Sequence, residues 1–149
     1  MIAVIQRVKN SSVSISGVVN GECAHGLMIL LGVAKGDTQE DARLLATKIA
    51  KLRIFCDENG KMNLSIKDVD GEALIVSQFT LLANYKKGNR PDYFGAAEPN
   101  IAIPLYEYFV ELMRSEVKHV GTGEFGADMQ VSILNDGPVT IVMDSNQLK

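Results

Sequence analysis

The sequence predicts an α+β fold in which a mostly antiparallel, barrel-like β core carries two main helices. Three observations predict this class: short runs of alternating apolar residues recur, only two segments have the apolar spacing of a helix, and strands do not alternate regularly with helices. No linker, repeat or low-complexity tract divides the 149 residues. We therefore expect a single domain over residues 1–149.

The first third of the chain is expected to consist of strands. Residues 2–8 alternate well enough for a strand, and residues 11–24 have the period of a hairpin with Asn20-Gly21 as its turn signal. Residues 26–34 form a continuous apolar run bounded by glycines. The length and the ends of that run favour a central strand over a helix.

Two later segments are expected to be helical. Residues 37–52 carry an apolar stripe, and Thr38 and Asp41 have the spacing of a capping box. Residues 103–118 carry a second stripe, with Pro104 in the first turn, where proline is tolerated. These are the only helices that the sequence predicts.

The segments between and after the helices complete the expected sheet. Residues 53–65 suggest two short extended pieces around a polar turn, residues 71–84 the strongest strand of the chain, and residues 85–100 a loop rich in Gly, Pro and cations. The last segment, residues 121–145, suggests two strands around "NDGPVT". In that motif Asp-Gly signals a hairpin, but Pro138 removes a backbone donor where the returning strand should begin.

Composition limits the classes of function. A hydrophobic content of 46% with 22% charged residues is typical of a globular protein, and a net charge of −3 weighs against a general nucleic-acid binder without excluding a local basic site. Cys23 and Cys56 lack the spacing of a zinc site or a disulfide framework, so we expect reduced thiols. The absence of a signal-peptide pattern and of any span-length apolar run predicts a soluble, cytoplasmic protein.

Ordinary acid–base chemistry has few candidates in this sequence. His25 and His119 stand at predicted element boundaries, and neither has a visible nucleophile as partner. The carboxylates lie at a helix start and in turns, and no phosphate-binding glycine motif is present. We therefore expect no metal, no cofactor and no catalytic histidine.

Polar residues inside the apolar segment 71–84 are the first candidates for a site. In a strand, Gln78 and Thr80 would share one face, with Ser77 and Phe79 on the other. Buried polar groups cost about 1–3 kcal/mol if left without partners. They therefore either pair with neighbouring backbone or form the floor of a site whose backbone N–H groups hold an oxyanion. Thr80 is a possible nucleophile, but the lack of an evident base favours catalysis by positioning.

A cationic loop and an isolated arginine are further candidates. Lys86, Lys87 and Arg90 are interleaved with aromatic residues, a pattern that suits RNA phosphates and stacked bases as well as it suits a solvated loop. Arg7 lies among apolar residues of the first strand and is either an edge charge or an inward anchor for a polar network. The aromatic residues of the loop are Tyr85, Tyr93 and Phe94.

Two motifs together resemble a known family. "SQFTL" (77–81) and "NDGPVT" (135–140) are similar to the signature pair of the D-aminoacyl-tRNA deacylases, also called D-tyrosyl-tRNA deacylases. Other segments resemble the same family in the same order, so that the resemblance covers nearly the whole chain. They are "AVIQRV", "LLGVAKGDT", "KIAKLRIF", "DENGKMNLS", "GNRP" and "GEFGADMQV".

The resemblance implies a homodimer that hydrolyses the ester between a D-amino acid, or glycine mischarged on tRNA-Ala, and the 3′ end of tRNA. It implies that Gly137-Pro138 is a cis dipeptide that enters the active site of the other subunit, where its carbonyls exclude L-aminoacyl esters. Arg7 resembles the residue that fixes this dipeptide. The residues implied to line the site are Ser77, Gln78, Phe79 and Thr80.

The resemblance is compatible with two mechanisms. The family resemblance allows Thr80 as nucleophile or assistance by the terminal 2′-OH of the tRNA, and the missing base favours the second. Asp92 and Tyr93 depart from the shorter Ser-Phe type that is common in the family, placing an extra acid beside the loop expected to face RNA. The alternatives are an editing domain that removes a mischarged L-amino acid and a non-catalytic RNA-binding module, which the acidic pI of about 5.4 disfavours.

Overall fold

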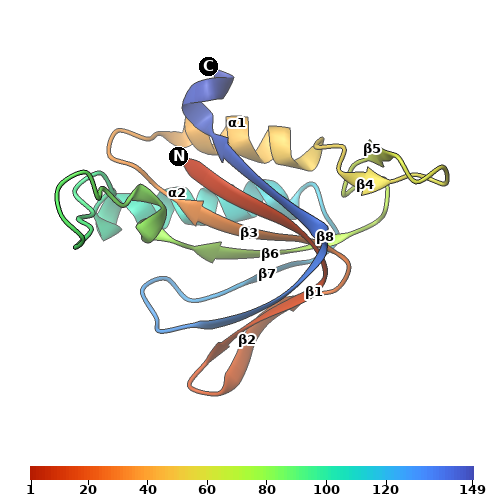
Figure 1. Ribbon diagram of the computed structural model, residues 1–149, viewed down its shortest axis with the longest axis horizontal. Helices are drawn as coiled ribbons and strands as arrows, with labels where there is room; N and C mark the ends of the chain where they lie inside the picture. The colour runs from red at the N-terminus through yellow and green to blue at the C-terminus, as the bar shows by residue number, and fades with distance from the viewer.

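Six strands form one mixed sheet, two helices pack against it, and a two-stranded hairpin stands apart (Figure 1). The computed structural model describes residues 1–149. The α+β class and the two main helices are confirmed. In chain order the elements are β1 (Ile2–Ile15), β2 (Val18–Cys23), β3 (Gly26–Gly32), α1 (Gln39–Ala50), β4 (Phe55–Cys56), β5 (Met62–Leu64), β6 (Glu72–Ser77), the 3-10 helix η1 (Phe79–Leu82), α2 (Pro99–Arg114), β7 (Val120–Thr122), β8 (Gln130–Asp144) and the 3-10 helix η2 (Ser145–Leu148).

The main sheet mixes antiparallel and parallel pairs. Strand β1 pairs antiparallel with β2, β3 and β8, whereas β3 pairs parallel with β6 and β6 parallel with β7. The expected, mostly antiparallel core is therefore only partly right. The parallel pairs arise because α1 lies in the chain between β3 and β6, and α2 between β6 and β7, and such long crossover connections return the chain in the same direction.

The sheet curls until its ends nearly meet, as the barrel-like expectation required. Where β2 passes β7, the Asn20 amide donates a hydrogen bond of 2.9 Å to the Thr122 carbonyl. A Cβ atom at Gly21 would lie only 2.3 Å from that same carbonyl oxygen, so this close approach requires glycine. A ring nitrogen of His119 lies 2.8 Å from the Glu22 carbonyl, which gives this histidine a structural position.

The hairpin between β1 and β2 turns earlier than the sequence predicts. Its turn is Ser16-Gly17, where both residues have positive φ, while Asn20-Gly21 lies within β2. A two-residue turn with positive φ at both positions matches the twist of the flanking strands. The Asn-Gly signal was therefore wrong, because a second, less typical turn sequence four residues earlier makes the connection.

The two helices differ in how well their ends were predicted. Helix α1 begins with the expected capping box, in which the Asp41 carboxylate accepts the Thr38 N–H at 2.8 Å. Helix α2 begins at Pro99 and ends at Arg114, four residues before the expected bounds at each end. Pro99 starts the helix because its fixed φ suits the first helical position, which leaves Pro104 inside the helix rather than in its first turn.

Apolar side chains are buried on both faces of the sheet. The larger cluster has 25 buried residues and fills the space between the strands and the two helices, with Phe109 and Leu45 as central members from α2 and α1. A smaller cluster of six, including Met28 and Leu74, lies on the opposite face. This packing fixes β3 and β6, the strands that lead to the candidate site.

No helix of the protein has both the length and the apolar character needed to cross a bilayer.

Strand β6 ends at Ser77, well before the predicted end of this segment at residue 84. The Gln78 N–H still bonds to the Leu31 carbonyl at 2.8 Å, after which the backbone turns into η1. The neighbouring strand β3 ends at Gly32, so residues beyond Gln78 have no strand to pair with. The predicted alternation of side chains from Gln78 onward is therefore wrong.

Candidate functional site

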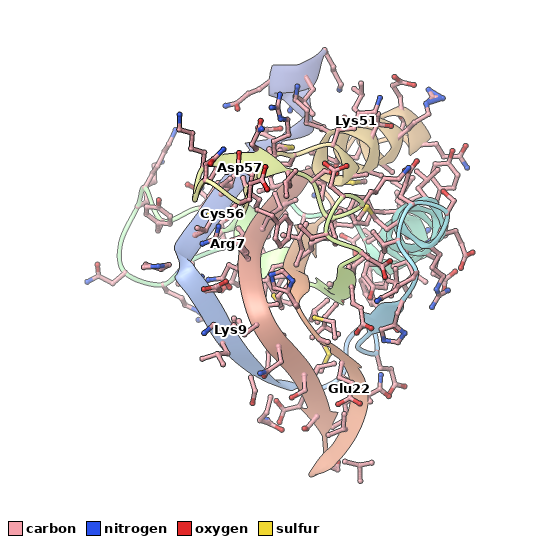
Figure 2. All side chains as sticks on the ribbon, turned by 90° about the vertical axis from the view of Figure 1, so that its right-hand side faces the viewer. Arg7, Lys9, Glu22, Lys51, Cys56 and Asp57 are labelled. Atoms are coloured by element: carbon pink, nitrogen blue, oxygen red, sulfur yellow. The ribbon has the colours of Figure 1, made fainter.

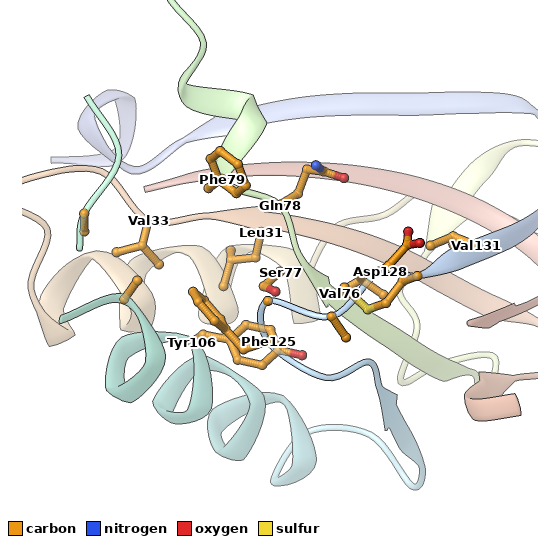
Figure 3. Close-up of a pocket in the computed structure, with 15 residues that line it drawn as sticks. Leu31, Val33, Val76, Ser77, Gln78, Phe79, Tyr106, Phe125, Asp128 and Val131 are labelled. Carbon is orange, nitrogen blue, oxygen red and sulfur yellow. The ribbon is translucent and has the colours of Figure 1, made fainter. Parts of the chain in front are cut away.

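A cavity of about 300 Å³ opens at the carboxyl ends of the parallel strands β3 and β6 (Figure 3). Ligands commonly bind at this edge of parallel strands. The lining is mostly apolar, and Asp128 carries its only charge. The lining residues are Leu31, Val33, Val76, Ser77, Gln78, Phe79, Ala97, Ala102, Tyr106, Phe125, Gly126, Ala127, Asp128, Met129 and Val131.

The "SQFT" motif forms one rim of this cavity. Ser77 ends β6 and Phe79 begins η1, and these two residues and Gln78 line the cavity, whereas Thr80 does not. The Gln78 side-chain amide donates a hydrogen bond to the Thr80 hydroxyl. Ser77 and Gln78 are half-buried, and Phe79 and Thr80 are exposed. The sequence predicts polar side chains buried within a strand. In the structure, Ser77 and Gln78 lie instead at the rim of the cavity.

The backbone at the start of η1 offers hydrogen-bond donors. The first N–H groups of a helix have no partner within it, and the Gln78 side chain does not cap η1. Leu81 is the first residue of the turn whose N–H bonds backward, to the Gln78 carbonyl at 3.3 Å. The N–H groups of Phe79 and Thr80 precede it in the turn, and of these two residues Phe79 lines the cavity.

The "NDGPVT" motif lies within a single strand, not at a hairpin. Strand β8 pairs with β1 on both sides of it: Asn135 lies opposite Val8, and Thr140 lies opposite Gln6. Residues 136–139 therefore lie opposite a single residue of β1, Arg7, and form a large bulge. The predicted hairpin is wrong, because pairing with the long strand β1 overrides the local Asp-Gly turn signal.

The bulge has an unusual backbone. The Gly137-Pro138 peptide bond is cis, as the family resemblance implied. Gly137 has φ of 144°, and a Cβ atom at this position would lie 3.1 Å from Arg7 Nη2 and 2.8 Å from Val139 Cγ2. Only glycine fits this backbone and this space without displacing a neighbour.

The Arg7 side chain holds the bulge in place through hydrogen bonds. Its Nε donates to the Asp136 carbonyl at 2.9 Å, and its Nη1 donates to the Ile54 carbonyl at 2.7 Å. The side chain is nearly buried, and Figure 2 shows it beside Cys56, whose sulfur lies 3.7 Å from Nη1. Of the two readings of Arg7, the inward anchor is the one that the structure confirms.

Asn135 holds the other end of the bulge. Its side-chain oxygen accepts the Val139 N–H at 2.8 Å, and its side-chain nitrogen lies 3.3 Å from the Val139 carbonyl and 3.1 Å from the Thr140 hydroxyl. The Gly137-Pro138 dipeptide is thus fixed on both sides while its own two residues stay exposed. Asn135 was not predicted as a functional residue, because an Asn before Asp-Gly looks like an ordinary turn residue.

One chain does not bring the two motifs together. Gly137, Pro138 and Arg7 are absent from the lining of the cavity that "SQFT" borders. The bulge lies on β8, which pairs only with β1 and so leaves its other edge open. Within one chain, the two motifs therefore lie in two separate places.

The loop that follows η1 carries the predicted cations at the surface. Lys86, Lys87 and Arg90 are exposed, and none of them makes an ion pair. The extra acid in this loop, Asp92, accepts hydrogen bonds from the Asn84 amide at 3.1 Å and from the Phe94 N–H at 3.3 Å. Asp92 is thus occupied in shaping the loop.

Several lining residues were missed from the sequence. Tyr106 forms part of the wall from α2, and its hydroxyl donates to the Ile75 carbonyl at 2.8 Å. Burial raises the pKa of Tyr106 to about 12, so the hydroxyl stays protonated. Phe125, Asp128 and Met129 come from the segment between β7 and β8. The sequence signal that could have identified them is an aromatic residue, an acid and a methionine within a connection that contains glycine.

The two histidines and the two cysteines lie outside the cavity lining. The His25 ring packs edge-on against Phe55, with ring centroids 5.3 Å apart. Cys23 and Cys56 are free thiols. Burial, reinforced by Glu72, raises the pKa of the Cys23 thiol to about 12. These residues have structural explanations.

Comparison with known proteins gives one consistent result. A family model described as D-Tyr-tRNA(Tyr) deacylase matches residues 4–144. The chain is 56% identical over 148 residues to a D-aminoacyl-tRNA deacylase of Thermosipho africanus, covering 99% of each chain. It is 60% identical over 148 residues to a D-aminoacyl-tRNA deacylase of Sulfurihydrogenibium sp., covering 99% of this chain and 100% of the relative.

Solved structures share the fold over almost the whole chain. One, named c-Myc DNA Unwinding Element Binding Protein, superposes with a TM-score of 0.91 at 41% identity, covering 97% of this chain and 98% of the other. A second, titled as a probable eukaryotic D-amino acid tRNA deacylase, superposes with a TM-score of 0.80, covering 96% and 98%. At 16% identity this second likeness concerns the fold alone. With a family model over residues 4–144 and relatives matched along their full length, the chain belongs to the D-Tyr-tRNA(Tyr) deacylase family.

Proposed function

We propose that this chain hydrolyses the ester bond of D-aminoacyl-tRNA, releasing free tRNA and the D-amino acid. The full-length match to D-aminoacyl-tRNA deacylases supports the reaction class. One structural observation carries the proposal: an apolar cavity is bordered by backbone donors, and a separate rigid bulge presents backbone instead of a side chain. A cavity and a backbone bulge of this kind suit recognition of a chiral centre better than recognition of one particular side chain.

The cavity rim has the groups needed to hold an ester carbonyl. The N–H groups of Phe79 and Thr80 would hold the carbonyl oxygen as it becomes an oxyanion, and Ser77 and Gln78 would position the ester. The Thr80 side chain is not the nucleophile in this scheme. Its hydroxyl accepts a hydrogen bond from the Gln78 side-chain amide, and an amide cannot act as the base that removes a proton. The 2′-OH of the terminal nucleoside then assists attack by water.

Chiral selection is assigned to Gly137-Pro138 of a second subunit. The dipeptide is exposed and held by Arg7 and Asn135, yet it does not line the cavity of its own chain. Placed in the cavity of a partner, its carbonyls would occupy the space that an L side chain needs. Glycine has no side chain, so glycyl-tRNA, including glycine mischarged on tRNA-Ala, would also be accepted.

The open edge of β8 supports the homodimer that this scheme requires. This strand carries three exposed apolar side chains, Ile133, Leu134 and Val142. An unpaired edge with exposed apolar residues is a surface on which a second chain can pack. A two-fold arrangement would then place the bulge of each subunit toward the other subunit.

The remaining parts of the proposal concern the substrate and the cell. Lys86, Lys87 and Arg90 would contact phosphates of the acceptor end, since their charges have no carboxylate partner. The scheme uses only side chains, backbone groups and the substrate's own hydroxyl, so it needs no metal or cofactor. The place of action would be the cytoplasm, where aminoacyl-tRNA is used.

Incubation of the purified protein with D-Tyr-tRNA, L-Tyr-tRNA and glycyl-tRNA-Ala tests the proposal. Release from the D-ester and the glycyl ester with L-Tyr-tRNA intact is the expected result. Release from the L-ester would indicate an L-editing domain instead. Binding of tRNA without any release would indicate a non-catalytic RNA-binding module.

A further inference from the structure

The loop beside the cavity concentrates the exposed aromatic side chains of the protein. The chain has five phenylalanines and four tyrosines, and the three that are exposed all lie within residues 79–94. Tyr85 is 74% exposed, Phe94 79% and Phe79 55%. Large apolar rings gathered on one exposed segment mark a surface for a partner rather than a core.

One of these rings, Phe79, borders the cavity. Phe79 borders the cavity in Figure 3, and the Tyr93 ring packs edge-on against it with centroids 5.0 Å apart. Ala97, three residues after Phe94, lines the cavity as well. A molecule whose end occupies the cavity therefore meets this loop as it leaves.

The backbone of the loop is held in place at both ends. Asn84 and Asp92 exchange two backbone hydrogen bonds of 2.9 Å, and the Asp92 carboxylate accepts the Phe94 N–H. The Gly95 carbonyl accepts the Lys35 N–H at 2.9 Å. Tyr85 and Phe94 are thus presented on fixed backbone, which lowers the entropic cost of binding a partner.

The charges of the loop select the class of partner. Lys86, Lys87 and Arg90 carry three positive charges without an ion-pair partner, in a chain whose net charge is −3. Two copies of this loop facing each other would repel, whereas a polyanion would be attracted. Exposed rings among unpaired cations suit single-stranded nucleic acid, whose bases stack on rings while its phosphates contact cations.

We infer that Tyr85 and Phe94 stack the unpaired nucleotides that immediately precede the terminal nucleoside of the tRNA. This inference rests on the proposed function, because the cavity must hold the terminal aminoacylated nucleoside. It adds a second contact region, in which rings hold the strand while Lys86, Lys87 and Arg90 neutralise its phosphates. Stacking does not depend on base identity, so this surface would serve different tRNAs alike.

The test compares two substrates that differ only in this strand. One is D-tyrosyl-tRNA, and the other is the 3′-O-D-tyrosyl ester of adenosine, which lacks the preceding nucleotides. For Phe94→Ala combined with Tyr85→Ala, the kcat/KM on D-tyrosyl-tRNA relative to that on the adenosine ester should fall about tenfold or more. Phe94→Tyr should retain the wild-type ratio and Phe94→Leu should lose it, because the ring and not apolarity alone is required.

Val18→Ser is the matched control, since Val18 is a 70% exposed apolar residue at the start of β2, and Figure 1 shows strand β2 far from the loop that follows η1. It should leave the ratio of the two substrates at the wild-type value. An unchanged ratio in the double variant would overturn the inference. So would a change of oligomeric state in that variant, measured by sedimentation, because the rings would then contact a second copy. Wild-type protein that cleaves neither substrate would contradict the proposed function instead.

Discussion

At the residue scale, the surroundings of the Thr80 hydroxyl favour the mechanism in which Thr80 is not the nucleophile. The hydroxyl lies on the exposed side of η1 and accepts a hydrogen bond from the Gln78 amide. A threonine nucleophile needs a base that removes its proton, and an amide cannot serve as one. The backbone N–H of residue 80, which any residue but proline would supply, is the group that the proposed chemistry uses.

We therefore expect Thr80→Ala to keep most of the single-turnover rate on D-Tyr-tRNA. The substitution removes the hydroxyl but leaves the N–H groups of Phe79 and residue 80 in place. Rates are measured with enzyme in excess, together with tRNA binding. Loss of the chemical step with tRNA binding intact would show that the hydroxyl itself attacks or transfers a proton.

Arg7 is the second residue whose role can be tested alone. Arg7→Lys keeps the charge but cannot reach the carbonyls of both Asp136 and Ile54 in the same way, since lysine lacks the planar fork. The free energy of unfolding should fall by about 1–3 kcal/mol, as for loss of a buried, charge-assisted hydrogen bond. The preference for D- over L-Tyr-tRNA should fall as well, because the bulge loses its anchor.

Lys9→Gln is the control for Arg7→Lys. Lys9 lies two residues further along β1, and it is exposed in the view of Figure 2. Urea unfolding and the hydrolysis of both esters should match the wild type. A variant at Arg7 with unchanged selectivity would show that the bulge keeps its position without the guanidinium.

At the element scale, the helix α1 shows how one carboxylate joins distant parts of the fold. Asp41 is buried, which raises its pKa, but hydrogen bonds from Ser145, Lys149 and the Thr38 N–H outweigh burial and hold the pKa below the usual value near 3.8. The ionised form thus links the capping box to η2 at the other end of the chain.

Asp41→Asn should lower the free energy of unfolding by about 1–2 kcal/mol at pH 7. Because the folded pKa is lowered, the stabilisation is fully present above the unfolded pKa and is lost as pH falls below about 4. The difference between variant and wild type should therefore shrink on acidification. Urea unfolding between pH 7 and 3 measures it, with Glu40→Gln, an exposed acid of the same helical turn, as control. A difference that grows on acidification would contradict this sign.

The elements also show what the sequence could and could not predict. A polar turn between two short extended pieces located the β4–β5 hairpin. Apolar periodicity located β3 and both helices, because these patterns follow from burial of one face. It divided β1, one strand over Ile2–Ile15, into a strand over residues 2–8 and the first arm of a separate hairpin. It extended β6 too far, because the end of a strand depends on where its neighbour β3 stops. It split β8 at "NDGPVT", because a local turn signal cannot reveal a bulge that long-range pairing with β1 imposes.

The site was predictable to a similar extent. Ser77, Gln78 and Phe79 do border a cavity, and Arg7 does hold the Gly137-Pro138 segment. The cis peptide bond was predicted from the family resemblance and not from the apolar periodicity. The lining from α2 and from the segment after β7 escaped prediction, because only the folded chain brings these segments to the end of β6.

At the scale of the whole molecule, the separation of the two motifs in one chain makes a prediction about subunits. Gly137→Ala should distort the bulge, since the added Cβ would press on Arg7 and Val139. Ala127→Trp should fill the cavity from its half-buried rim and block it. Each variant on its own then lacks one part of the proposed site.

A heterodimer of the two variants, made by co-expression with two affinity tags, should recover selectivity. In the proposed dimer, its one open cavity would belong to the Gly137→Ala subunit and would face the intact bulge of the Ala127→Trp subunit. The ratio of D- to L-Tyr-tRNA hydrolysis should rise toward the wild-type value. A ratio equal to that of the Gly137→Ala homodimer would show that each bulge serves the cavity of its own chain.

The proposed function requires that this protein separates substrates by the hand of the amino acid. The most direct measurement is an internal competition, in which D-Tyr-tRNA and L-Tyr-tRNA carry different isotopic labels in one reaction with the wild-type protein. The released tyrosine gives the ratio of the two kcat/KM values. We predict that the D label alone is released while the L-ester persists; release of both labels at similar rates would contradict the claim.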